Sequence, residues 1–236
     1  MRRRFLATAT LTLGAWILST AAVYGQAAAP AQPQWKSQEE YDLVQAIYKD
    51  TNAATRLVKL DDWKKKFAET DFASNRRLLY MGTYLEANKL PEFFTAADEV
   101  VAAEPNNFQA LTAMAVNIYR TNPPSPSQLD SVTKGCSHVV NNTDAVFPGD
   151  KVPQGVQPAA WEQTKSQTKL LCQNTLGWAA MMQKDHVKAE EEFEKALKLE
   201  GKNAQITYWL ATSVIAQKDI KKYPKALYHL ARAANY

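Results

Sequence analysis

Residues 176–200 read LGWAAMMQKDHVKAEEEFEKALKLE, and this stretch decides the fold. Ala189, Phe193 and Ala196 are spaced by four and three residues, so they share one face of a helix. Gly177 lies twelve residues before Ala189, on a preceding helix. We expect the small Gly177 to let the second helix approach closely, while Phe193 fills the gap toward whatever packs next.

The same pattern recurs near the end of the chain. Ala226, Leu230 and Ala233 repeat the intervals of four and three. Leu176-Gly177 recurs as Leu210-Ala211, and this period of roughly 34 residues is typical of a solenoid of stacked helix pairs. Such an array presents an extended binding surface.

The pattern also extends toward the N-terminus. Phe93, Ala97 and Val100 show the intervals of four and three, and Phe93 lies twelve residues after Tyr80-Met81. Met114-Ala115 follows Tyr80-Met81 at the same period that separates Leu210-Ala211 from Leu176-Gly177. Agreement on both the period and the interval of twelve favours a repeat over the alternative, an irregular helical bundle with accidental spacing.

These positions resemble the tetratricopeptide repeat (TPR) family. Leu176, Gly177, Ala189, Phe193 and Ala196 look like its packed helix-pair consensus. The turn Pro105-Asn106-Asn107 resembles the proline turn between repeats of that family. Three features depart from the family pattern: Phe93 and Ala97 exchange the usual small and large residues, Gly201 replaces a turn proline, and residues 220–222 are extra. The resemblance implies an all-α, right-handed α-solenoid of about five helix-turn-helix pairs within residues 37–236. The pairs are expected near 37–73, 74–107, 108–143, 158–203 and 204–236. Ser37 and Glu40 are expected to form a capping box at the start of the first helix.

An insertion interrupts the third pair. A helix cannot cross the proline-rich linker Thr121-Asn-Pro-Pro-Ser-Pro-Ser127. The insertion itself is residues 141–158, which are rich in glycine and proline. The sequence predicts a helix from Trp161 to Met182 that is longer than the repeat needs and packs against the insertion. The insertion is either part of a binding face or a solvent-exposed decoration.

The N-terminus has the features of an export signal. Arg2, Arg3 and Arg4 precede an uncharged, mostly apolar stretch, which predicts a signal peptide over residues 1–25 followed by a disordered linker over 26–36. Cleavage is expected after Gly25, or within Ala27–Ala29. The signal fits general secretion or, through its arginines, the twin-arginine route. The protein is then periplasmic or secreted from a bacterium; the alternative is an uncleaved anchor in the inner membrane.

Composition argues against a nucleic-acid partner. The 236 residues are 46% hydrophobic and 22% charged, as in ordinary soluble proteins. The net charge is +4, but loss of Arg2, Arg3 and Arg4 leaves 25 basic residues against 24 acidic ones. Nothing in the sequence requires the basic stripe that a nucleic-acid binder usually carries.

Cys136 and Cys172 are the two cysteines of the chain. The repeat places Cys136 on the second helix of the third pair and Cys172 near the start of the next helix, so their helices should be neighbours. In an exported protein this arrangement predicts a disulfide. The alternative is two buried thiols that act as small hydrophobic residues.

The sequence offers little catalytic chemistry. Its three histidines lack metal-type spacing, and it contains neither a phosphate-binding glycine loop nor a nucleophile elbow. The run Glu190, Glu191, Glu192 and Glu194, with Lys188, Lys195 and Lys198 nearby, could be paired carboxylates but is interpreted as a solvated helix face with i,i+4 support. We therefore expect no enzyme activity, no metal and no cofactor.

Function should then lie in binding, on a concave groove formed by the first helix of each pair. Nine positions are predicted to line it: Thr112, Val116, Tyr119, Asn174, Trp178, Met181, Tyr208, Thr212 and Ile215. The groove is largely apolar and aromatic, and Asn174 is its one hydrogen-bonding anchor of the kind that clamps a peptide. This favours a hydrophobic helix or an extended peptide as ligand. The alternative is that the insertion covers Trp178 and Met181, which then serve as core.

The sequence therefore predicts an exported scaffold or adaptor of the bacterial envelope that binds a protein or peptide partner. A second hypothesis is a structural subunit that oligomerises through an uncapped C-terminal repeat. A third is an enzyme whose site lies in the insertion. Membrane association is expected only if the N-terminal segment is retained.

Overall fold

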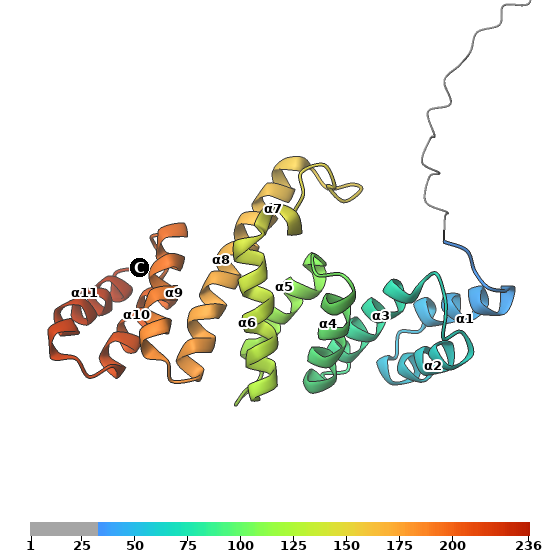
Figure 1. The fold of residues 1–236 in the computed structure, drawn as a ribbon, viewed down its shortest axis with the longest axis horizontal. Coiled ribbons are helices and arrows are strands. Elements are labelled where there is room, and N and C mark those ends of the chain that lie inside the picture. Colours follow the sequence, from blue (N-terminus) through green and yellow to red (C-terminus); the bar gives the residue numbers. More distant parts are fainter. Residues whose placement is uncertain (1–32) are drawn as a thin grey trace, which may run out of the picture. The chain divides into compact units, whose positions relative to one another are not determined.

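The computed structural model describes residues 33–236, and all regular elements in this range are helices (Figure 1). The helices are α1 (Gln38–Lys49), α2 (Ala53–Lys66), α3 (Ala73–Glu86), α4 (Leu90–Ala103), α5 (Phe108–Asn117), η1 (Ile118–Arg120), α6 (Pro126–Asn141), α7 (Thr143–Val146), α8 (Pro158–Met182), α9 (His186–Leu199), α10 (Ala204–Ala216), η2 (Ile220–Lys222) and α11 (Tyr223–Ala234). The expected all-α solenoid is confirmed. The predicted signal peptide lies outside the described residues.

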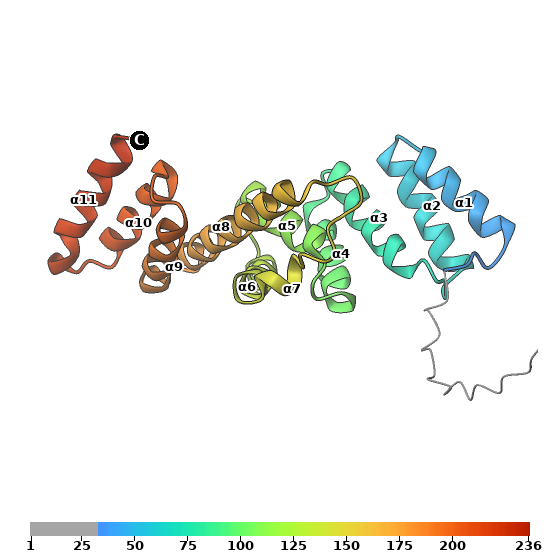
Figure 2. The same cartoon turned by 90° about the horizontal axis from the view of Figure 1, so that it is seen from above.

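Five helix pairs follow one another along the chain, at the ranges expected from the repeat. They are α1–α2, α3–α4, α5–α6, α8–α9 and α10–α11. Each helix packs against the helix before it in this series, and Figure 2 shows α4, α6 and α9 along one side with α5, α8 and α10 along the other.

The turns inside three of the pairs are equivalent. Asn88, Lys184 and Lys218 each follow a first helix and have positive φ values of 55°, 63° and 59°. A residue in this left-handed conformation closes the end of a helix and starts the turn. Lys184 and Lys218 are separated by the same interval as Gly177 and Ala211, so the backbone repeats with the period of the sequence.

Two hydrophobic clusters hold the array together. A small one lies between α1 and α2, formed by Val44, Ile47, Leu60 and Trp63, and a second, larger one spans α3 to α11. Tyr80 packs against both clusters, so it joins the first pair to the others.

The start of the first pair departs from the predicted capping box. Ser37 caps α1 by accepting a bond from the amide of Glu40, at 3.2 Å. The Glu40 carboxylate does not reach back to Ser37: it accepts bonds from the Lys36 amide and from Trp63 Nε1, both at 2.8 Å. Burial against Trp63 therefore redirects Glu40 into the core.

The predicted linker ends earlier than expected. Trp35 stacks on Phe72 with ring centroids 3.6 Å apart and packs against the first cluster. The backbone N–H of Gln34 also donates to the Asp71 carboxylate at 3.0 Å. Residues 34–36 thus belong to the folded array, whereas residues 26–32 lie outside the described residues.

The contact between Gly177 and Phe193 explains the close approach of α8 and α9. A Cβ built at Gly177 would lie 2.6 Å from Phe193 Cδ1, closer than real Cβ contacts allow. Phe193 is fully buried and its ring also lies 5.9 Å from that of Trp209 in the next pair. The small-to-large fit predicted from spacing is therefore present within the pair and between pairs.

The insertion packs against the extended start of α8. That helix has 25 residues and begins at Pro158, three residues before the predicted start. Trp161 contacts the rings of Phe147 and Phe108 at 5.2 and 5.0 Å and donates to the Pro148 carbonyl at 3.3 Å. Lys165 pairs with Asp144 at 2.7 Å. The insertion is thus anchored at its base by an aromatic cluster.

Candidate functional site

The nine predicted groove residues differ in accessibility. Val116, Tyr208 and Ile215 are about half exposed, on α5 and α10. A second group is partly buried: Thr112, Tyr119, Asn174, Met181 and Thr212. Trp178 is buried, with 8% of its surface exposed. The accessible apolar surface of the predicted groove is therefore centred on Val116, Tyr208 and Ile215.

An aromatic cluster joins the last three pairs. The ring of Tyr119, in η1 after α5, lies 4.9 Å from that of Trp178 on α8 and 6.1 Å from that of Trp209 on α10. The Tyr119 and Trp209 rings are nearly parallel, at 13°. Trp209 was missed by the sequence prediction. A signal existed, because Trp209 stands one repeat period after Thr175, whose hydroxyl also contacts Tyr119.

A chain of hydrogen bonds fixes the Tyr119 ring. Asn174 Nδ2 donates to the Tyr119 hydroxyl at 3.4 Å. The same hydroxyl oxygen lies 2.9 Å from Thr175 Oγ1. Since Thr175 donates to the Leu171 carbonyl at 2.8 Å, its oxygen is left to accept from Tyr119. Burial raises the pKa of Tyr119 well above its usual value, so the phenol stays a neutral donor.

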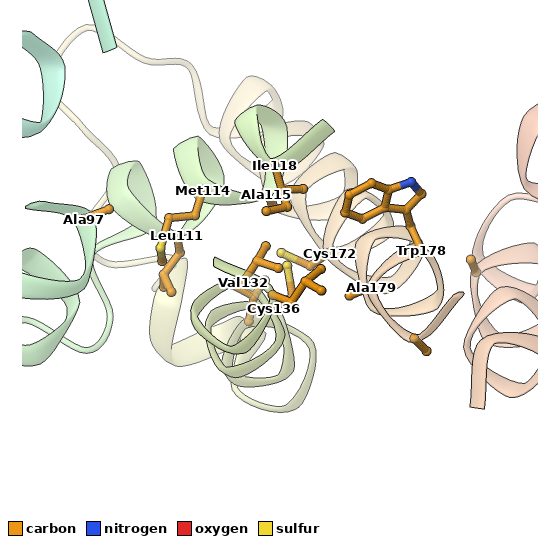
Figure 3. Packing of buried hydrophobic residues seen from close by; sticks show 14 of the residues in the cluster. Ala97, Leu111, Met114, Ala115, Ile118, Val132, Cys136, Cys172, Trp178 and Ala179 are labelled. Atoms are coloured by element: carbon orange, nitrogen blue, oxygen red, sulfur yellow. The ribbon is translucent and has the colours of Figure 1, made fainter. Parts of the chain in front are cut away.

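Trp178 is not an accessible groove residue, which corrects the prediction for this position. Its indole packs beside Tyr119. Trp178 belongs to the main core, part of which is drawn in Figure 3. The aromatic contacts of the insertion lie at Phe108 and Trp161, and Trp161 is 17 residues before Trp178 on α8. The neighbouring helices bury Trp178 because Tyr119 reaches across from the preceding pair.

Two polar atoms of the predicted groove are buried without a hydrogen-bond partner among the described residues. They are Thr112 Oγ1 and Asn174 Oδ1. An unpaired buried acceptor is costly, because it has lost its bonds to water. The Asn174 side chain donates through Nδ2 to Tyr119, so its nitrogen is paired while its buried oxygen is not.

Glu190 and Glu192 of the acidic run on α9 are buried, which corrects the interpretation of the whole run as a solvated face; Glu191 is exposed and Glu194 is partly buried. Glu190 is buried and accepts bonds from Gln217 Nε2 at 2.6 Å and Lys222 Nζ at 2.7 Å, as well as from Lys225. Burial alone would raise the pKa of Glu190, but these donors outweigh it and lower the pKa to about 2. Glu190 thus ties the last pair to α9.

Glu192 is buried on the other side of the same helix. It accepts bonds from Lys188 at 2.7 Å and Lys195 at 3.0 Å, and its carboxylate also meets the Gln173 amide of α8. Burial opposes ionisation, yet the two lysines and the amide lower the pKa of Glu192 overall. Both buried carboxylates therefore have a structural role between helices.

Cys136 and Cys172 face each other between α6 and α8 (Figure 3). Both are buried and present as thiols. Burial, together with the adjacent Cys172, raises the pKa of the Cys136 thiol well above its usual value. The predicted proximity of their helices is present; the disulfide itself stays a prediction.

Four surface cavities lie away from the predicted groove. Their volumes are about 280, 400, 460 and 750 Å³, and their lining residues include none of the nine groove positions. The 460 Å³ cavity lies between the turn at Pro105 and the insertion, beside Trp161. None of these four cavities coincides with the candidate binding surface.

Residues 33–236 contain no group of three or more His, Cys, Asp or Glu side chains placed to hold a metal ion. Within the same range, we find no helix that combines the length and the hydropathy needed to cross a membrane.

Comparison with known proteins supports the architecture. No protein-family model matches the sequence, and no curated protein matches it. Among solved structures, the MamA RS-1 ArsTM double mutant is similar to this chain, with a TM-score of 0.53 and 15% sequence identity. The match covers 84% of this chain and 92% of that one. The fold is TPR-like. At this level of identity, the likeness concerns the fold alone.

Proposed function

We propose that this chain is an exported scaffold or adaptor of the bacterial envelope, which binds an apolar helix or extended peptide on the first-helix face of its last three pairs. The carrying observation is the set of half-exposed apolar side chains on this face, Val116, Tyr208 and Ile215. They accompany the partly buried rings of Tyr119 and Trp209. Rigid aromatic side chains provide large contact area at low entropic cost.

Asn174 is the one hydrogen-bonding anchor predicted for this surface. Its Oδ1 lacks a partner among the described residues, while its Nδ2 is committed to Tyr119. Because Asn174 Oδ1 is buried, a bound segment reaches it only if neighbouring side chains move, so the accessible apolar side chains would provide most of the affinity.

A matched pair of valines tests the surface. Val116 on α5 and Val187 on α9 are both about half exposed, but only Val116 belongs to the proposed face. Photocrosslinking residues placed at 116, 208 and 215 should capture the same partner in the host cell, and one at 187 should not. Val116→Lys should abolish capture from position 208, and Val187→Lys should leave it intact. Equal crosslinking from positions 116 and 187 would refute the proposed face.

Export has its own test. Cell fractionation should place the protein in the periplasm or medium, and sequencing of its N-terminus should start at Gln26 or a few residues later. An intact Met1 on a membrane-bound protein would instead establish the anchored form.

A further inference from the structure

Helix α11 carries a second apolar face that lies outside the proposed peptide-binding face. Its inward row, Ala226, Leu230 and Ala233, has the spacing of four and three that packs a pair together. On the outward side, Leu227 of α11 is 65% exposed, and Ile220, in η2 directly before α11, is 77% exposed. Tyr223, also exposed, lies between them at intervals of three and four, so the three side chains form one stripe.

The preceding pair reveals what this stripe does in the array. Alignment of the inward row of α9 with that of α11, so that Ala189 matches Ala226, places Leu227 at the position of Glu190. Glu190 is buried by the next pair, through Gln217, Lys222 and Lys225. The outward stripe of α11 is therefore the face against which another helix pair would pack.

The first helix of a second copy fits this face in length, chemistry and charge. Helices α1 and α11 both have 12 residues, or about 18 Å each. The outward side of α1 exposes Tyr41 and Tyr48, two turns apart. Among the exposed charged residues, Glu39 and Asp42 outnumber Lys49 on α1, whereas Lys218 and Lys221 outnumber Asp219 just before α11. These charges attract each other, whereas two α11 faces would repel.

We propose that copies of this chain associate head to tail, with the α11 stripe of one copy packed on the α1 face of the next. Such a contact joins two different surfaces, so the assembly can grow beyond a dimer, either as an open chain or, if the rotation between copies closes, as a ring. Because part of the attraction is electrostatic, the assembly weakens as salt rises. This association uses α11 and α1, so it holds or fails independently of the proposed peptide-binding face.

Two blocked variants of the full chain test the proposal. Leu227→Asp places an acidic residue on the α11 stripe, which is the tail of the copy. Tyr48→Lys places a basic residue on the α1 face, which is the head. Both sites are exposed, so each variant should keep the wild-type circular dichroism spectrum. By light scattering across a concentration series, the wild type should grow beyond a dimer, and each variant alone should be a monomer.

An equal mixture of the two variants gives the decisive result. The Leu227→Asp variant keeps an unblocked α1 face, and the Tyr48→Lys variant keeps an unblocked α11 stripe. The two variants can therefore pair once, so the mass should rise to that of a dimer and stop there. The control variant Val187→Asp, on α9, should assemble like the wild type. A wild type that stays monomeric, a mixture that stays monomeric, or a Tyr48→Lys variant that dimerises by itself would each overturn head-to-tail association.

Discussion

Substitution of Gly177 by alanine tests the repeat packing most directly. The new Cβ would lie 2.6 to 3.0 Å from three ring carbons of Phe193, which is fully buried and cannot swing aside. Overpacking of this kind costs about 1–3 kcal/mol. Replacing a helical glycine by alanine returns roughly 1 kcal/mol. The expected net effect is a loss of about 1 kcal/mol in the free energy of unfolding.

Gly82 provides the matched control. It lies inside α3, and a Cβ built there meets no atom within 4 Å. Gly82→Ala should therefore stabilise the protein by up to about 1 kcal/mol, because only the helix propensity changes. The difference between the two substitutions, about 2 kcal/mol, isolates the contact with Phe193.

Urea unfolding monitored by circular dichroism measures both changes, with the slope checked for two-state behaviour. In the Gly177→Ala background, Phe193→Leu should cost less stability than it does alone, because the smaller side chain relieves the clash. The reasoning fails if Gly177→Ala and Gly82→Ala change stability by the same amount in the same direction.

Three further substitutions or conditions address other contacts. Because the pKa of Glu190 is about 2 in the fold, the contribution of its carboxylate to the free energy of unfolding is complete above about pH 4.5 and is lost as the pH falls toward 2. Glu190→Gln should lower the free energy of unfolding by about 1–3 kcal/mol at neutral pH. It should also reduce the loss of stability at acid pH, and urea midpoints across pH measure both effects. Protein isolated from an oxidising compartment should be two hydrogens lighter than reduced protein by mass spectrometry; two thiols that react after denaturation would rule out a disulfide between Cys136 and Cys172. Trp161→Ala should speed protease cleavage within residues 147–157 several-fold, and an unchanged cleavage rate would show that Trp161 does not anchor the insertion.

Spacing predicted the helix pairs because packing within a pair depends on positions that recur with the repeat. Gly177 and Phe193 are sixteen residues apart, and they meet because α8 is followed directly by its partner α9. The turn at Lys184 recurs at Lys218 for the same reason. Contacts of this kind involve neighbouring segments, so a single sequence contains enough information to place them.

Contacts between pairs were harder to predict. The pattern of charges around Glu190 is the one that an exposed helix shows, but its partners Lys222 and Lys225 come 32 and 35 residues later. The same holds for Trp209, which reaches back to Tyr119 across the intervening pair α8–α9. Local spacing identifies a helix face and leaves open whether a distant residue will cover it.

This distinction determines which predicted groove residues can bind a partner. By the repeat register, Val116 and Trp178 occupy equivalent positions, yet Val116 is about half exposed and Trp178 is buried beside Tyr119. A ligand can therefore contact Val116 directly, whereas a change at Trp178 acts first on the core. Trp178→Ala should lower stability by about 3–5 kcal/mol, as large-to-small core changes do. Loss of binding in that variant would be uninformative, so Val116→Lys, Tyr208→Ala and Ile215→Ala are the changes that separate recognition from folding.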